Sequence, residues 1–227
     1  MRGTGATGTD RTAIEAYLRG LDRALTGPAR TRADLLTEAR HSLLDAAAGY
    51  RAEGLDPAAA QRRAVREFGP VGEVAAGYQA ELAAGAARSL SVRVVVAWLL
   101  LMLGADWVWR GAPWTGPRPP AGYLLLGDSL DWLWLGCGPL ALASLGWWVW
   151  SARHGRPGSV RLARVIGVVL TGAVALGCLG GIGLYAWSVD LWAGALRWPP
   201  MLVGLPLLCL LHAWLGHGAV RCLTAAR

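Results

Sequence analysis

The feature that most constrains this chain is a set of four apolar runs in its second half. They cover residues 94–110, 131–150, 165–187 and 199–217. A helix needs about 20 predominantly apolar residues to cross the hydrocarbon core of a bilayer, and each run is close to that length. Backbone groups in lipid must be satisfied within the spanning segment, which favours helices. The sequence therefore predicts four transmembrane helices.

Charge and tryptophan divide the chain into two different parts. Residues 1–90 contain 12 Arg, 11 acidic residues and no Trp, whereas residues 91–227 contain 10 Arg, 4 Asp and all 13 Trp. We expect an all-α protein with a small cytoplasmic four-helix module at 11–86, a helical connector at 87–93 and a four-span transmembrane domain at 94–227. Residues 1–10 lack the apolar core of a signal peptide and predict a flexible tail.

Arginines in the short loops predict the orientation of the spans. Positive residues near the spans favour the cytoplasmic side. One side carries Arg110, Arg118 and Arg197, and the other carries a larger set: Arg88, Arg93, Arg153, Arg156, Arg161, Arg164, Arg221 and Arg227. This distribution predicts a multi-pass protein of the cytoplasmic (inner) membrane with both termini in the cytoplasm.

Helical periodicity runs through residues 11–90. Apolar residues recur at helical spacing from Ile14 to Leu25, Asp56 and Pro57 favour a helix start, and Gly69 followed by Pro70 favours a break. The last helix of the module can run with little interruption into the first span. The predicted module core contains Tyr17, Leu21, Leu43, Phe68 and Tyr78.

Two segments of the module carry a family pattern. The string IEAYLRGLDRAL contains a YLxxL opening. The string LLTEARHSLLDAAAGYRAEGLDPAAAQRRAVREFGPVGEVAAGYQAEL contains the E-x-x-H of Glu38 and His41, and later Ala64, Phe68, Gly69 and Tyr78. Over residues 11–83, about a third of the chain, this pattern resembles the permease prefix domain of actinobacterial membrane proteins. It is also similar to the wider group of helix-turn-helix-associated α-helical signalling (HAAS) domains.

This resemblance implies a cytoplasmic adaptor whose partner is a PadR-type winged-helix transcription regulator, with the spans acting as sensor or anchor. The alternative is an accessory membrane subunit of a permease or ABC-type transport system. A lipid-modifying membrane enzyme is a third hypothesis, for which Asp128, Asp131 and Asp190 are the candidate acids. The module has no Gly-rich phosphate loop, no Ser/His/Asp set and no lysine, so we expect no enzyme activity and no cofactor.

Two further groups of residues are candidates for contacts. Ala173, Gly177 and Gly181 form a small-xxx-small stripe, which lets helix backbones approach closely in lipid. The stripe predicts either a homodimer interface or packing against 131–150 or 199–217 of the same chain. Arg62, Arg63 and Arg66 form a basic face that is a candidate partner contact. No metal site is expected, because the spacing of Cys209, His212, His217 and Cys222 matches no closed Cys/His set. Without base-reading residues, we expect no direct nucleic-acid binding.

Overall fold

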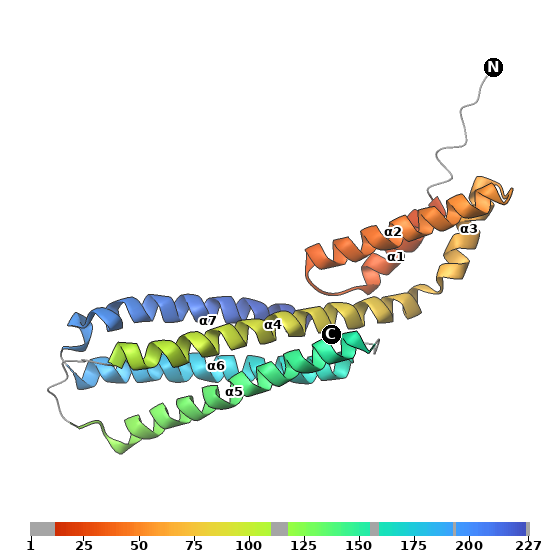
Figure 1. The fold of residues 1–227 in the computed structure, drawn as a ribbon. Helices are drawn as coiled ribbons and strands as arrows, with labels where there is room; N and C mark the ends of the chain where they lie inside the picture. Colours follow the sequence, from red (N-terminus) through yellow and green to blue (C-terminus); the bar gives the residue numbers. More distant parts are fainter. Residues whose placement is uncertain (1–11, 110–117, 155–158, 193, 226–227) are drawn as a thin grey trace. The chain divides into compact units, whose positions relative to one another are not determined.

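The computed structural model describes residues 12–109, 118–154, 159–192 and 194–225, and the predicted tail at 1–10 lies outside them. All regular structure in these ranges is helical (Figure 1). This confirms the all-α prediction for the described residues. The helices are α1 (Thr12–Ala24), α2 (Ala29–Ala52), α3 (Pro57–Phe68), α4 (Val71–Trp109), α5 (Ala121–Arg153), α6 (Val160–Leu191), the 3-10 turn η1 (Ala195–Arg197) and α7 (Pro199–Ala225).

The chain divides into two compact units. The N-terminal unit comprises Met1–Ala83 with Thr224–Arg227, and the membrane unit comprises Ala84–Leu223. Helix α4 begins in the first unit and continues in the second without interruption over 39 residues. The predicted continuous passage from the module into the first span is therefore confirmed as far as Trp109, and Arg110 lies outside the described residues.

Helix boundaries in the N-terminal unit follow local chemistry. The Asp56 carboxylate accepts hydrogen bonds from the backbone N–H groups of Ala58 and Ala59 at 3.0 Å, and Pro57 occupies the first turn of α3. This is an N-cap, which satisfies donors that the first turn leaves free. Gly69 ends α3 with φ of 106°, a conformation that disfavours residues with a side chain.

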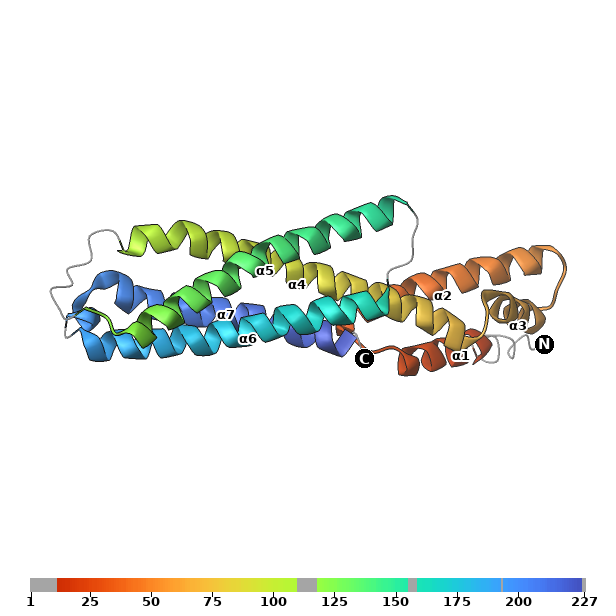
Figure 2. The same cartoon turned by 90° about the horizontal axis from the view of Figure 1, so that it is seen from below.

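The core of the N-terminal unit is built from apolar faces of α1, α2, α3 and the start of α4. Figure 2 shows the ribbons of these helices from below. Tyr17, Leu21 and Leu43 are buried, while Phe68 and Tyr78 are partly buried and pack against the same cluster. The rings of Tyr17 and Phe68 meet edge to face, with centroids 5.8 Å apart. The Tyr17 hydroxyl donates a hydrogen bond to the carbonyl of Gly69 at 3.0 Å, which joins α1 to the α3–α4 turn.

Among the described residues, four helices are long and apolar enough to cross a bilayer: α4, α5, α6 and α7. The helices extend beyond several of the predicted spans, since α5 covers Ala121–Arg153 where the apolar run predicted 131–150. Many large apolar side chains face outward, as expected for a surface that contacts lipid; they include Leu103, Leu125, Trp132, Leu179 and Leu210. The chain is thus built as a multi-pass membrane protein.

Glycines allow the helices of the membrane unit to pack closely. Helices α5 and α6 run side by side and cross at an angle (Figures 1 and 2). A Cβ atom added to Gly138 of α5 would lie 2.4 Å from the Trp98 indole of α4, and one added to Gly180 of α6 would lie 2.6 Å from Leu130 of α5. A larger residue at either position would force a neighbour to move, the Trp98 indole at Gly138 and the end of the Leu130 side chain at Gly180.

Buried hydroxyl groups connect the spanning helices. Ser91 of α4 and Ser144 of α5 are hydrogen-bonded through their Oγ atoms at 2.7 Å. The Ser188 hydroxyl donates to the carbonyl of Leu184 at 2.7 Å, so the Tyr123 hydroxyl, 2.9 Å from Ser188 Oγ, donates to it. The second pair satisfies the buried Tyr123 hydroxyl, whereas the hydroxyls of Ser91 and Ser144 also lie within hydrogen-bond distance of carbonyls of their own helices.

Candidate functional site

The basic face of α3 is the surface of the N-terminal unit that the sequence singles out for a partner. Arg62 and Arg66 are exposed, whereas Arg63 is only half-exposed. The three residues lie on α3. Arg63 is held by Tyr50 of α2, by Glu53 directly after the end of α2, and by Glu67 of α3 itself. The structure therefore separates Arg63 from the two neighbours that extend into solvent.

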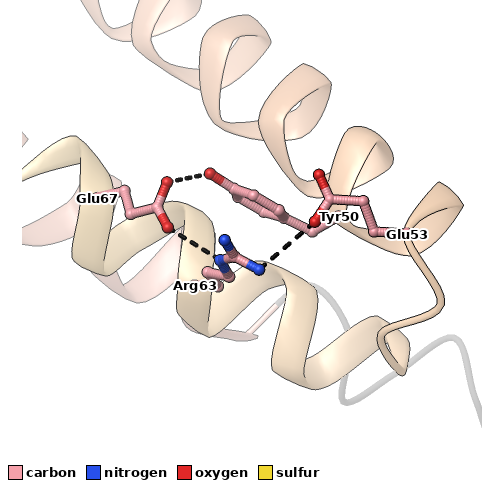
Figure 3. A network of polar contacts seen from close by, with 4 residues as sticks. All are labelled: Tyr50, Glu53, Arg63 and Glu67. Carbon is pink, nitrogen blue, oxygen red and sulfur yellow. Dashed lines mark hydrogen bonds and ion pairs between the residues drawn. The ribbon is translucent and has the colours of Figure 1, made fainter.

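Arg63 is the centre of a four-residue network that joins α2 to α3 (Figure 3). Its Nε donates to Glu67 Oε1 at 2.9 Å, and its Nη1 lies 3.5 Å from Glu53 Oε2. The guanidinium stacks on the Tyr50 ring, 4.3 Å from the centroid, and the Tyr50 hydroxyl donates to Glu67 Oε2. The arrangement orients a planar cation between an aromatic face and two carboxylates.

The network shifts the ionisation of its members. The hydrogen bond to Glu67 raises the pKa of the Tyr50 hydroxyl, because the bond requires the protonated phenol. The hydrogen bonds from Tyr50 and then Arg63 lower the pKa of the Glu67 carboxyl below its ordinary value. Ionised Glu67 is therefore the form that the folded N-terminal unit favours.

The lowered pKa of Glu67 predicts a pH-dependent contribution to stability. A carboxyl whose pKa is lower in the folded state stabilises the fold above its unfolded pKa, about 4.3 for glutamate. This contribution is lost as the pH falls from that value through the folded pKa. We expect Glu67→Gln to lower the thermal unfolding midpoint of the full-length protein in detergent near neutral pH. The difference in unfolding midpoint between variant and wild type should shrink within a pH window that runs from the unfolded pKa of Glu67 down through its lower folded pKa.

Asp45→Asn is the matched control for this prediction, because Asp45 is an exposed carboxylate of α2 outside the network. Its effect on the unfolding midpoint near neutral pH should be smaller than that of Glu67→Gln, because the Asp45 carboxylate makes no contact in the network. A Glu67→Gln deficit that stays constant from neutral pH to below the window would contradict the assignment.

The small-residue stripe of α6 faces other helices of the same chain. A Cβ atom on Gly177 would lie 2.9 Å from the Trp134 ring of α5, and one on Gly181 would lie 3.5 Å from Leu208 of α7. Ala173 is half-buried. Of the two interpretations of the stripe, this geometry favours packing within the chain. The homodimer stays a prediction. Its interface would use a different surface, or the stripe would contact both a second copy and the helices of its own chain.

Several contacts of the membrane unit were not predicted from the sequence. Arg93 of α4 donates to the carbonyl of Trp214 on α7 at 2.9 Å and stacks on its ring, 5.3 Å from the centroid. His212 is buried and Cys209 exposed, although they lie three residues apart. Within the described ranges, no three His, Cys, Asp or Glu side chains gather closely enough to hold a metal ion. Cys209 and His212 are close in sequence, but their unequal burial places the two side chains in different surroundings.

Comparison of the chain with models of protein families, with curated proteins and with solved structures gave no match.

Proposed function

We propose that this chain is a membrane-bound signalling adaptor. In this proposal the helical module at 11–86 lies in the cytoplasm and binds a protein partner, for which a PadR-type transcription regulator is the candidate. The four spans act as its sensor or anchor. The observation that carries the proposal is the uninterrupted α4, which supplies residues both to the module core and to the membrane unit. A helix shared in this way is a direct covalent route between a membrane event and a soluble surface.

Two features support the proposed orientation and partner surface. Arginines gather at the end of the membrane unit where α5 ends and α6 begins, and the described residues of that set are Arg88, Arg93, Arg153, Arg161, Arg164 and Arg221. By the positive-inside rule this end faces the cytoplasm. In the module, Arg62 and Arg66 remain exposed beside the Arg63 network and are free to meet an acidic surface.

The proposal is tested by co-elution of the full-length protein with the PadR-type regulator encoded nearest to its gene. Both proteins would be purified, mixed in a nonionic detergent and separated by size-exclusion chromatography. We expect a shared peak with the wild type. The charge-reversed variant Arg62→Glu/Arg66→Glu should weaken the complex about tenfold or more, because opposed charges at an interface are replaced by like charges.

The control variant is Arg23→Glu/Arg30→Glu, which reverses two exposed charges on α1 and α2. It should bind the regulator as wild type does. Separate peaks for the wild-type proteins would overturn the adaptor proposal. Co-purification with a transport ATPase or permease subunit would then favour the accessory-subunit hypothesis.

A further inference from the structure

The membrane unit contains a cavity of about 490 Å³ among its four spanning helices. Residues of α4, α5, α6 and α7 line it, together with Trp192 after the end of α6. Cavities of roughly 300–1,000 Å³ are typical of sites for small molecules. Three of the lining residues, Gly127, Gly177 and Gly181, have no side chain to fill the space.

His212 also lines this cavity, and one of its ring nitrogens has no partner among the described residues. The residue is 8% exposed, and its Nδ1 lies 2.8 Å from the carbonyl oxygen of Leu208. A carbonyl only accepts hydrogen bonds, so Nδ1 carries the hydrogen and Nε2 of the neutral ring is an acceptor. Nε2 is buried and has no hydrogen-bond partner among the described residues. Buried polar atoms in proteins are almost always paired, so Nε2 is an acceptor that the described residues leave unsatisfied.

The cavity wall also carries a negative charge and aromatic rings. Asp131 of α5 lines the cavity, and the described residues provide it with no ion-pair partner. Trp134 packs edge to face against His212, with ring centroids 6.4 Å apart, and Tyr123 meets Trp192 at 5.5 Å. Aromatic faces attract organic cations, and the exposed Asp131 carboxylate adds a negative charge at the edge of the cavity.

We propose that this cavity binds an amphipathic organic amine, a molecule with a protonated nitrogen and an apolar body of small-drug size. Asp131 neutralises the ammonium charge, and the aromatic rings of Tyr123, Trp134 and Trp192 surround it. His212 Nε2 accepts a hydrogen bond from an N–H or O–H of the same molecule. The apolar body lies against leucine side chains of the four helices: Leu101, Leu130, Leu184 and Leu208. This inference concerns the membrane unit alone and does not depend on the partner of the module.

The test is a binding titration with aminoacridine, a fluorescent aromatic amine that is cationic at neutral pH. Full-length protein in a maltoside detergent is added to the dye, and fluorescence anisotropy is recorded against protein-free micelles. We expect saturable binding by the wild type and at least about tenfold weaker binding by Asp131→Asn, because the ion pair is lost. His212→Leu should also weaken binding, and acridine, the uncharged parent ring, should bind at least about tenfold less tightly than aminoacridine.

Two pairs of variants separate binding in the cavity from effects on folding. Gly127→Leu should abolish binding, because Gly127 lines the cavity and has open space where a side chain would enter. Gly136→Leu, on the same helix but outside the cavity, is the control for Gly127→Leu and should bind like wild type. Asp128→Asn is the control for Asp131→Asn and should also bind like wild type. Size-exclusion profiles check that each variant is folded. Wild-type protein without saturable binding, equal binding of acridine, or a folded Gly127→Leu or Asp131→Asn variant that binds like wild type would each overturn the proposal.

Discussion

Replacing Leu43 by Ala is expected to destabilise the N-terminal unit by about 2–5 kcal/mol. Leu43 is completely buried at the centre of the cluster that α1 and α2 form with α3 and the start of α4. Removing one methine and two methyl groups loses their transfer free energy and leaves a cavity that the helices only partly close. Since about 1.4 kcal/mol is a factor of ten in an equilibrium constant, the unfolded fraction of this unit should rise about 30-fold or more.

Pulse proteolysis with trypsin measures this effect on the full-length protein in detergent. The chain has no lysine, but the N-terminal unit has many arginines, so trypsin cuts its unfolded form quickly. Leu44→Ala is the matched control, because Leu44 is the next residue on α2 and is 47% exposed. Its effect should stay within about 0.5 kcal/mol. Equal protection of the Leu43→Ala and Leu44→Ala proteins would contradict the described core.

Replacing Gly138 by Ala is expected to destabilise the membrane unit by about 1–3 kcal/mol. The added Cβ would lie 2.4–2.6 Å from three ring atoms of Trp98, closer than carbon atoms can approach. The indole of Trp98 or the backbone of α5 must therefore move. In an open helical position the same substitution favours the helix by up to about 1 kcal/mol, so the expected sign is the reverse of the intrinsic preference.

Gly136→Ala gives the comparison within the same helix, because a Cβ atom at Gly136 has no neighbour within 4 Å. The thermal midpoint for loss of the monodisperse peak in detergent should fall for Gly138→Ala and stay the same or rise for Gly136→Ala. A double variant, Trp98→Leu with Gly138→Ala, should be more stable than the sum of the single effects predicts, because the smaller side chain removes the clash. Additive effects would show that Trp98 and Gly138 are not coupled.

The elements of the fold were largely predictable because local signals are strong in this chain. The spacing of Tyr17 and Leu21 marks one buried face of α1, and Asp56 with Pro57 marks the start of α3. Apolar length identified the spans but underestimated α5, since residues 121–130 contain Asp128 and stand apart from the apolar run. Hydropathy identifies only the part of a helix that can lie in lipid. The backbone hydrogen bonds of the helix can extend beyond that apolar part.

The contacts between helices were much less predictable. The spacing of Ala173, Gly177 and Gly181 indicated close packing but could not show that Trp134 and Leu208 are the neighbours. Arg62 and Arg63 are adjacent in the sequence and similar in chemistry, and only the position of Tyr50 and Glu67 makes one of them part of a network. These facts depend on which faces of separate helices meet, and a single sequence does not contain that information.

Asp131 and His212 illustrate the same limit in the membrane unit. Both were visible as polar residues at or within apolar runs, which is a signal for function in a membrane protein. They are far apart in the sequence and lie on α5 and α7, and the cavity that both line exists only after the helices pack. The spacing of Cys and His residues along the sequence contains no information about this cavity.

The glycines of the cavity also bear on how such a site can diversify. Every glycine codon is a single nucleotide from codons for alanine and valine. At Gly127 a Cβ atom meets open space, and at Gly181 it makes only ordinary contact with Leu208. Single point mutations at these two positions would reduce the cavity volume in steps while the helices and the pair of polar side chains stay in place. The size of the accepted molecule could thus evolve separately from its charge.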